Sequence, residues 1–449
     1  MAEQVDTLIE AGWVVPVEPE GVILKDHAVA INNGRIKAVL PIEEARSRFT
    51  ADETVSLPDH VITPGFVNAH THAAMSLLRG YADDLPLMTW LNDHIWPAEG
   101  QFVGPDFVRD GSELAMAEML KGGTTCFNDM YFFPDIVARA ASRLGMRASV
   151  GMIVIEFPSA WAQNADEYMS KGLAVRDAFK ADPLISCVFA PHAPYTVSDD
   201  SLVKLRGYAD ELNCPVHMHV HETAQEVADA EAEHGERPLA RLARLGLLGP
   251  DMLCVHMTQL TDEEIELVAT HGASVLHCPE SNLKLASGFC PVASLDAAGV
   301  NLALGTDGAA SNNDLDMIGE MRTAALLAKT VAGDAAALPA SRVLHMATLG
   351  GARALGLGDE IGSLTEGKWA DITAINLDNF ATQPVYNPIS QLVYAASRDQ
   401  VSDVWVAGRR LLQEGRLTAL DERELAARTR EWGREIASHR NASEHAANE

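Results

Sequence analysis

The stretch Val61–His72, read V-I-T-P-G-F-V-N-A-H-T-H, joins an apolar run to two histidines one residue apart. Side chains on an extended strand alternate between its two faces, so His70 and His72 point to the same side and can reach one metal ion. Zinc takes nitrogen ligands at about 2.0–2.1 Å and normally four ligands in all, so other parts of the chain must supply two more. A His-x-His pair alone is more often solvated or hydrogen-bonded, and the metal hypothesis therefore depends on later residues.

The composition is that of an ordinary globular chain. It has 449 residues, of which 47% are hydrophobic and 22% charged. This is ample for a large core, and an α/β barrel can take about 250 or more residues as one domain. No apolar run approaches the ~20 residues of a membrane span. The acidic residues of segment 1–10 differ from the basic start of a signal peptide, so we do not expect export.

Charge and cysteine content restrict the partners and the compartment. The chain carries 34 basic and 63 acidic residues, for a net charge of −29. Nucleic acids and anionic membranes need positive surfaces, so we expect neither as a partner. The six cysteines are scattered, with no C-x-x-C motif. They indicate small core residues in a reducing, cytoplasmic compartment, and neither a disulfide framework nor a thiolate zinc site.

From residue 61 onward, apolar strand candidates alternate with helical patterns. The strand candidates are Val61–His70, Thr124–Met130, Arg147–Ile155, Leu184–Ala190, Pro215–His221, Leu253–Met257, Ala273–Cys278 and Asn301–Thr306. Such alternation, with one helix expected over Glu226–Leu245 for example, is typical of a parallel sheet buried on both faces. Eight such units predict an α/β fold, a (β/α)8 TIM-type barrel with its site at the C-terminal ends of the strands.

Both ends of the chain are rich in strand and turn signals, such as the hairpin signal Asn32–Gly34 and the strand candidate Ile361–Leu364. We expect the two ends to pair into one small β-sandwich beside the barrel. The predicted domains are a composite β-sandwich of residues 1–62 and 362–420, a metal-dependent hydrolase barrel of residues 63–361, and a C-terminal helix and tail of residues 421–449.

Ionisable side chains gather where the predicted strands end. They are His70 and His72 on the first strand, His192 after the fourth, His217, His219, His221 and Glu222 on the fifth, His256 on the sixth, His277 on the seventh and Asp307 after the eighth. Burying such groups without partners costs several kcal/mol, so their placement indicates a function.

Spacing on the fifth strand favours one histidine as a metal ligand. His217, His219 and His221 share one face, and only those near the C-terminal rim can join the first pair. Glu222 follows His219 by three residues, a spacing that lets a carboxylate just past the strand reach over a bound metal. We therefore favour His219 over His221 and expect His217 in the core.

Two further residues complete the candidate site. Asp307 lies in G-T-D-G, where the flanking glycines allow close approach, and it is the candidate fourth ligand. An aspartate at this point can also be only a turn former. His256 ends the apolar run L-C-V-H and is suited to orienting an attacking water or stabilising charge, although a structural role is also open.

Taken together, the motifs P-G-F-V-N-A-H-T-H, H-x-x-E and G-T-D-G resemble those of the amidohydrolase superfamily. More narrowly, the chain is similar to the 5-methylthioadenosine/S-adenosylhomocysteine deaminases over nearly its whole length. The supporting stretches are Ala190–Thr196, His277–Leu285, Gly305–Asn313 and Glu366–Asp371. The resemblance implies hydrolytic removal of the 6-amino group from methylthioadenosine, adenosine or S-adenosylhomocysteine, with release of ammonia.

The resemblance also implies roles for individual residues. For the metal, it implies one zinc ion per chain, with Fe²⁺ or Mn²⁺ as alternatives, held by His70, His72, His219 and Asp307. For catalysis, it implies Glu222, His256 and Asp307. For the substrate, it implies that Glu99 binds the ribose hydroxyls, that His192 contacts the purine, and that Glu222 and Asp307 face the reacting ring.

One feature of the resembling family is missing. Members that hydrolyse S-adenosylhomocysteine carry an arginine just after the third strand, whereas Ser149–Met152 and Glu156–Gln163 contain none. A bidentate arginine–carboxylate contact has no neutral substitute, so we expect methylthioadenosine or adenosine to be preferred. Arg147 is a candidate replacement whose direction the strand alternation leaves open.

Other functions on this scaffold remain open. A two-metal cyclic amidohydrolase usually needs a carboxylated lysine on the fourth strand, and Leu184–Ala190 has no lysine. A guanine, cytosine or chlorotriazine hydrolase would share the same motifs. A closed structural zinc site would leave Glu222 and His256 without a role. The resemblance suggests a homo-oligomer, but the sequence identifies no interface.

Overall fold

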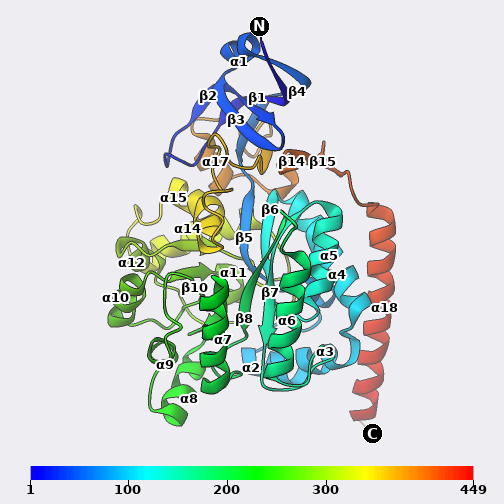
Figure 1. Cartoon of the computed structure of the whole chain (residues 1–449), viewed down its shortest axis with the longest axis vertical. Helices are drawn as coiled ribbons and strands as arrows, with labels where there is room; N and C mark the ends of the chain where they lie inside the picture. Colours follow the sequence, from blue (N-terminus) through cyan, green and yellow to red (C-terminus); the bar gives the residue numbers. More distant parts are fainter. Residues whose placement is uncertain (1, 448–449) are drawn as a thin grey trace.

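The computed structural model describes residues 2–447, and within them eight parallel strands form a near-closed barrel (Figure 1). Each strand neighbours the next one along the chain. The strands are β5 (Phe66–Thr71), β6 (Thr124–Asp129), β7 (Arg147–Val154), β8 (Ile185–Pro191), β9 (Val216–Val220), β10 (Met252–His256), β11 (Ser274–His277) and β12 (Leu302–Leu304). The predicted TIM-type barrel is confirmed.

The barrel closes between β12 and β5 through hydrogen bonds beside the strand ends. The Asp307 amide donates to His70 O at 3.0 Å, and the Thr306 amide donates to Asn68 Oδ1 at 3.0 Å. Gly305 allows this approach, because a Cβ atom there would lie 2.7 Å from the His70 nitrogen. Closure thus brings the end of the eighth strand directly against the first.

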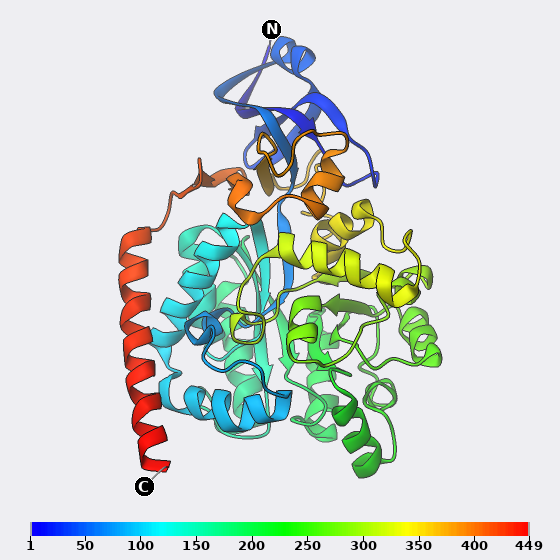
Figure 2. The ribbon, with the colours of Figure 1, turned by 180° about the vertical axis from the view of Figure 1, so that it is seen from behind.

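Helices surround the barrel, as Figures 1 and 2 show from opposite sides. They include α4 (Pro105–Lys121), α5 (Pro134–Leu144), α6 (Ala165–Phe179), α7 (Asp199–Leu212), α10 (Asp262–His271) and α14 (Met317–Ala332). The single helix predicted over Glu226–Leu245 is wrong. Two helices, α8 (Ala224–His234) and α9 (Pro238–Arg244), take its place. Gly235 ends α8 with φ +72°, and Pro238 starts α9, which are the usual positions of these residue types.

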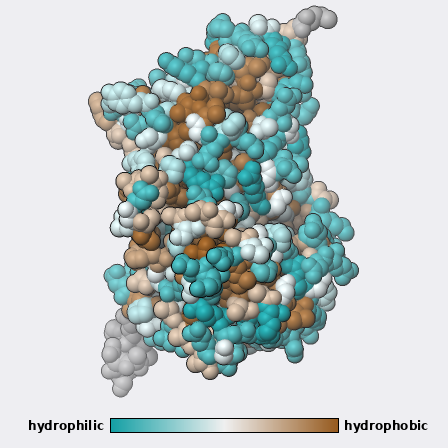
Figure 3. Space-filling view, turned by 90° about the vertical axis from the view of Figure 1, so that its left-hand side faces the viewer, coloured by the Kyte–Doolittle hydropathy of each residue, from teal (hydrophilic) through white to brown (hydrophobic). Residues whose placement is uncertain are grey.

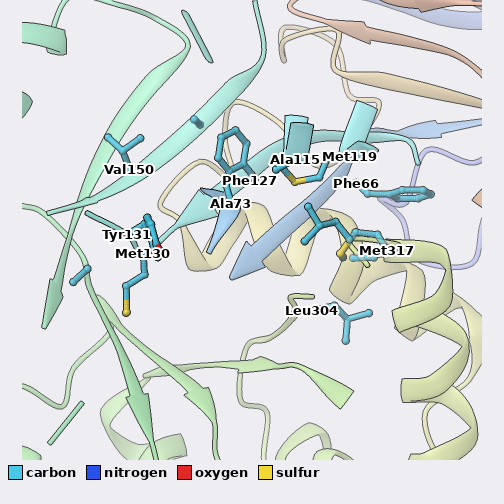
Figure 4. Packing of buried hydrophobic residues seen from close by; sticks show 14 of the residues in the cluster. Phe66, Ala73, Ala115, Met119, Phe127, Met130, Tyr131, Val150, Leu304 and Met317 are labelled. Atoms are coloured by element: carbon cyan, nitrogen blue, oxygen red, sulfur yellow. The ribbon is translucent and has the colours of Figure 1, made fainter. Parts of the chain in front are cut away.

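Apolar side chains fill the space between β5, β6 and the helix α4. Phe66 and Phe127 are fully buried, and Ala115 and Met119 of α4 lie beside them in Figure 4. Another residue of α4, Gly111, is packed so closely that a Cβ atom would lie 2.3 Å from Ala74 O. This packing fixes the 3-10 helix η1 (Ala73–Leu78), which directly follows the His-x-His pair.

The two ends of the chain form a second sheet, mixed in direction, with the order β16-β15-β14-β13-β4-β1-β2-β3. Its strands are β1 (Glu3–Val14), β2 (Leu24–Asn32), β3 (Arg35–Pro41), β4 (Phe49–Pro64), β13 (Ile372–Asn376), β14 (Val401–Val406), β15 (Arg409–Gln413) and β16 (Arg416–Leu417). This arrangement is consistent with the expected small sandwich beside the barrel, while the exact domain boundaries stay a prediction.

Two strand predictions near this sheet need correction. Val61–His70 is not one strand, because β4 ends at Pro64 in the terminal sheet and β5 starts at Phe66 in the barrel. Gly65 lies at the change of sheet, where a Cβ atom would meet the Thr125 side chain at 2.1 Å. The strand expected at Ile361–Leu364 is absent; that segment is irregular, and the Leu364 amide bonds Pro16 O at 3.0 Å.

The last helix, α18 (Glu422–Ala447), runs along the outside of the barrel (Figures 1 and 2). Arg428 pairs with Glu113 of α4 at 2.7 Å, and Trp432 Nε1 donates to Asp110 Oδ2 at 3.0 Å. Figure 3 shows one face of the molecule, on which hydrophobic areas are interrupted by hydrophilic side chains. Among the described residues, we find no helix that is both long and apolar enough to span a bilayer.

Candidate active site

Four nitrogen and oxygen donors converge at the C-terminal ends of β5, β9 and β12. His70 Nε2 lies 3.2 Å from His219 Nε2 and 3.3 Å from Asp307 Oδ1. His72 Nε2 lies 3.2 Å from the same carboxylate oxygen. Donor atoms of the three histidines all lie within 4.8 Å of one another. The structure therefore brings together the four residues that the resemblance implies as metal ligands.

The outer nitrogens of the first two histidines are also engaged. His72 Nδ1 donates to Met130 O at 2.6 Å. His70 Nδ1 lies 2.9 Å from His217 Nε2, and the other ring nitrogen of His217 faces the Asn128 amide at 3.2 Å. Such outer contacts fix the orientation of metal-binding imidazoles. His217 is buried as expected, but it contacts a candidate ligand, which the sequence did not reveal.

The carboxylate of Asp307 is held by its neighbours. Its Oδ1 accepts from the Gly308 amide at 2.7 Å, and its Oδ2 accepts from the hydroxyls of Ser281 and Ser311 at 2.7 and 3.0 Å. Both serines lie in motif stretches quoted from the sequence, yet no spacing rule pointed to them. Their bonds leave Oδ1 directed at His70 and His72.

This donor set fits a zinc ion. Three imidazole nitrogens and one carboxylate oxygen are common protein ligands of zinc. The Nε2 atoms of His70 and His219 face each other at 3.2 Å and are buried, and a cation bound between them would satisfy both nitrogens at once. His221, the alternative ligand on the fifth strand, points elsewhere, because its Nε2 accepts from the Leu239 amide at 3.1 Å.

Glu222 and His256 lie together beside the donor cluster. Glu222 Oε2 is 3.8 Å from His256 Nε2, and both side chains are buried. His256 Nδ1 donates to Asn282 Oδ1 at 2.8 Å, so its Nε2 is the nitrogen that faces the glutamate. Burial raises the pKa of Glu222 above the ordinary value, which favours its protonated form. The sequence did not predict the contact with Asn282.

A cavity of about 490 Å³ opens onto these groups. Most of its wall is apolar. Part of the wall comes from α2 (Leu87–Trp90), the π-helix η2 (Leu91–Ile95), α3 (Trp96–Phe102) and residues 157–160. In Figure 1, α2 and α3 lie at the end of the barrel opposite the terminal sheet. A largely apolar cavity with a few convergent polar groups is the usual form of a small-molecule site.

Glu99 and His192, the two other residues implied by the resemblance, also line this cavity. Glu99 Oε1 accepts from the Tyr131 hydroxyl at 2.7 Å, and burial raises the pKa of Glu99. His192 Nδ1 lies 3.1 Å from Thr196 Oγ1, and its ring centroid is 4.9 Å from that of His219. His192 therefore adjoins the donor cluster, while a tyrosine fixes Glu99.

No arginine or lysine is found among the described residues that line the cavity. Arg147 lies at the start of β7, the opposite end of that strand from the site. Its Nε and Nη2 donate to the Asp371 carboxylate at 2.8 and 3.1 Å, and its Nη1 donates to Pro183 O at 3.0 Å. Each of its three side-chain nitrogens has a partner there, so Arg147 does not replace the missing arginine.

A barrel with a histidine–aspartate cluster at its C-terminal rim, beside a buried glutamate and a cavity, has the organisation of a metal-dependent hydrolase. The chain belongs to the amidohydrolase family, whose model matches residues 61–411. The predicted superfamily resemblance is thereby confirmed.

Individual relatives agree with this assignment. The chain is 52% identical to a 5-methylthioadenosine/S-adenosylhomocysteine deaminase of Teredinibacter turnerae, over 97% of this chain and 99% of the relative. It is 48% identical to the enzyme of that name from Saccharophagus degradans, over 97% and 98% of the two chains. The predicted similarity to these deaminases is confirmed.

Solved structures add the metal. An adenosine deaminase from Xanthomonas campestris, crystallised with bound zinc, has a TM-score of 0.97 and 57% sequence identity. The match covers 98% of this chain and 100% of the deaminase. An atrazine chlorohydrolase from Arthrobacter aurescens has a TM-score of 0.88 at 24% identity, over 95% and 99%, and shows the shared fold alone. Family, relatives and donor set together support zinc as the metal of this hydrolase.

Proposed function

We propose that this chain is a zinc-dependent aminohydrolase. It replaces the 6-amino group of an adenosine-type nucleoside with oxygen, which gives the inosine analogue and releases ammonia. The observation that supports it best is the position of Glu222 and His256. They face each other at 3.8 Å beside the donor cluster and line the cavity that Glu99 also lines. The names of the relatives supply the class of substrate.

In this proposal His70, His72, His219 and Asp307 hold the metal. When bound, zinc supplies a Lewis acid that makes a water molecule more acidic. The serine hydroxyls on Asp307 Oδ2 keep its other oxygen turned toward the cluster.

Glu222 acts as the general acid. Adding the water oxygen to the ring carbon requires a proton on the adjacent ring nitrogen, and the amine must later gain one to leave as ammonia. Burial raises the pKa of Glu222, so it retains a proton to a higher pH than an exposed glutamate does. The Nε2 atom of His256, oriented by Asn282, and the Asp307 carboxylate hold the attacking water. Asp307 accepts the proton that this water loses and passes it to the departing amine, while the proton of the new hydroxyl returns to Glu222.

Two residues position the nucleoside. Glu99, held by the Tyr131 hydroxyl, accepts hydrogen bonds from the ribose hydroxyls. His192, whose ring adjoins that of His219, contacts the purine. These assignments place the ring at the cluster and the sugar toward α3.

The cavity wall supports a preference for methylthioadenosine or adenosine over S-adenosylhomocysteine. Phe157 and Trp96 line the cavity, whereas the described lining includes no arginine or lysine. An apolar 5′ group gains contacts there, while an amino-acid carboxylate would lose water without gaining a charged partner.

We also propose a cytoplasmic enzyme that forms a homo-oligomer and binds no nucleic acid. All six cysteines are free, which suits a reducing compartment. The net charge of −29 opposes binding to a phosphate backbone.

Ammonia release tests the function directly. Purified protein is given methylthioadenosine, adenosine, S-adenosylhomocysteine, guanine, cytosine and a chlorotriazine. Chloride release is measured for the triazine, and zinc is measured in the same sample. We expect ammonia from the adenosine analogues and one zinc per chain. Activity confined to guanine, cytosine or the triazine would contradict the proposal, as would two metals per chain.

A further inference from the structure

Glu226 is an ionisable residue that the proposed mechanism does not use. It is partly buried in the first turn of α8 and lines a neighbouring cavity, not the active-site cavity. Its carboxylate nevertheless contacts the catalytic segment, because Oε2 accepts from the Glu222 amide at 2.7 Å and Oε1 accepts from the His221 amide at 3.1 Å.

The backbone that Glu226 holds has an unusual conformation. His221 has φ +53°, a left-handed value that is uncommon for a residue with a side chain. The peptide carbonyls are also engaged, since Thr258 Oγ1 donates to Glu222 O at 2.7 Å and the Thr258 amide donates to His221 O at 2.9 Å. The Glu222 backbone is therefore bonded through both its amide and its carbonyl.

Glu226 does not make the capping-box contact that Glu264 makes. In α10, Glu264 is the third helical residue, and its carboxylate accepts from the amide of the N-cap residue Thr261 at 3.0 Å. Glu226 has the same position in α8, but its carboxylate reaches past the N-cap residue Thr223 to the two residues before it. The bonds are thus directed at the end of β9.

We propose that Glu226 is a positioning residue that fixes the peptide of His221 and Glu222 and thereby directs the Glu222 carboxylate toward His256. Without it, two amide donors lose their acceptor, and the left-handed turn loses a support on that side. A misplacement of about 1 Å can cost roughly 10²-fold in rate, so a small relaxation suffices to impair proton transfer. The rate effect rests on the proposed deaminase function, whereas the geometric effect does not.

A double-mutant cycle separates this role from a purely structural one. We expect Glu226→Ala to lower kcat for methylthioadenosine by tenfold or more, with KM and zinc content within twofold of the parent values. Glu226→Gln, which keeps one acceptor oxygen, should lie between. In a Glu222→Gln background, Glu226→Ala should cause no further loss of kcat. A folded Glu226→Ala with kcat within twofold of the parent, or losses that multiply independently, would overturn the proposal.

The chain offers a matched control in α6. Glu167 is also in the first turn of its helix, and its Oε2 accepts from the Gln163 amide, just before the N-cap Asn164, at 2.9 Å. Glu167→Ala removes a bond of the same kind away from Glu222, and we expect kcat to stay within twofold. A tenfold loss in this variant would show that any helix-start glutamate matters equally, and would overturn the assignment.

Crystal structures of zinc-loaded parent and Glu226→Ala give a readout that needs no turnover. We expect the Glu222 carboxylate to leave its place near His256 in the variant. An unmoved Glu222 overturns the positioning role even if the parent deaminates nucleosides. If the parent releases no ammonia, the proposed function fails, and the displacement of Glu222 still decides the role of Glu226.

Discussion

The barrel buries ionisable groups at both of its ends, but it arranges them in opposite ways. At the end that faces the terminal sheet, Arg147 and Asp371 are each 3% exposed and share two hydrogen bonds. Asp371 Oδ1 also accepts from the Ala407 amide at 2.7 Å. At the other end, His70 and His219 turn their inner nitrogens toward each other at 3.2 Å.

This difference separates a structural use of charge from a functional one. A buried ion pair whose two charges neutralise each other is complete within the protein and joins the barrel to the terminal sheet. Ligand atoms that converge on one point need a cation between them to satisfy them all, and here they border a cavity. The comparison predicts that changes at the end with the converging donors alter turnover, whereas changes at the end that faces the terminal sheet alter stability.

Glu222→Gln should give the largest effect. The amide keeps the size of the side chain but cannot donate the carboxyl proton, so we expect kcat to fall about 10³-fold, or about 4 kcal/mol. Zinc content and the melting temperature should stay close to the parent values, since Glu222 is not one of the four converging donors. Ammonia release and metal analysis on one sample measure both. Near-parental turnover would remove Glu222 from the mechanism.

Arg147→Met should have the reverse signature. It leaves the Asp371 carboxylate buried without its partner, which should lower the free energy of unfolding by about 3 kcal/mol. The folded fraction should retain parental kcat, because Arg147 does not line the cavity. Urea unfolding and active-site titration measure the two quantities.

The double variant Arg147→Met/Asp371→Leu is the control for that prediction. Replacing both charges by apolar groups should restore most of the stability, because no uncompensated charge remains. If Arg147→Met instead lowers kcat of the folded enzyme tenfold, the two ends of the barrel are coupled and the division of roles is wrong.

The same comparison explains how far the sequence could predict the structure. Strand alternation predicted the barrel, and the rule that barrel sites lie at strand ends led to His70, His72, His219 and Asp307, because those positions follow from period and spacing. The direction of Arg147 could not be predicted in this way. Its partner is Asp371, 224 residues away, in a segment that belongs to the other sheet.

Contacts around the site were hidden for a similar reason. Ser281 and Asn282 each touch a candidate catalytic residue, but only because β10, β11 and β12 are adjacent in space. The amide contacts of Glu226 depend on the left-handed turn at His221, which a histidine gives no reason to expect. By contrast, the break between α8 and α9 follows a glycine and a proline that the sequence displays.

The apolar wall of the cavity predicts a smaller effect, on substrate choice. We expect kcat/KM for methylthioadenosine to exceed that for S-adenosylhomocysteine by about tenfold, equivalent to ~1.4 kcal/mol. Equal values would show that another group has replaced the missing arginine. Ala160, an exposed residue that lines the cavity, offers a gain-of-function test. Ala160→Arg should lower the ratio of kcat/KM for methylthioadenosine to kcat/KM for S-adenosylhomocysteine, whereas the neutral Ala160→Gln should leave this ratio unchanged.

The smallest predicted effect concerns a buried histidine outside the converging set. His345 of α15 (Ala340–His345) is 6% exposed, and its Nδ1 accepts from Arg342 Nη1 at 3.0 Å. Burial, together with the Arg342 charge, lowers the pKa of His345 from 6.5 to about 4. Because the unfolded chain binds this proton more tightly, the stabilisation is present above pH 6.5 and is lost as pH falls toward 4.

Between pH 7.5 and 6.0, this linkage should remove about 0.8 kcal/mol of unfolding free energy from the parent. His345→Asn keeps an acceptor for Arg342 and cannot take up the proton. Between the same two pH values, the unfolding free energy of this variant should therefore fall by about 0.8 kcal/mol less than that of the parent. Urea unfolding of both proteins at the two pH values measures the difference. Equal losses of unfolding free energy would mean that His345 takes up a proton in the folded protein as readily as in the unfolded chain.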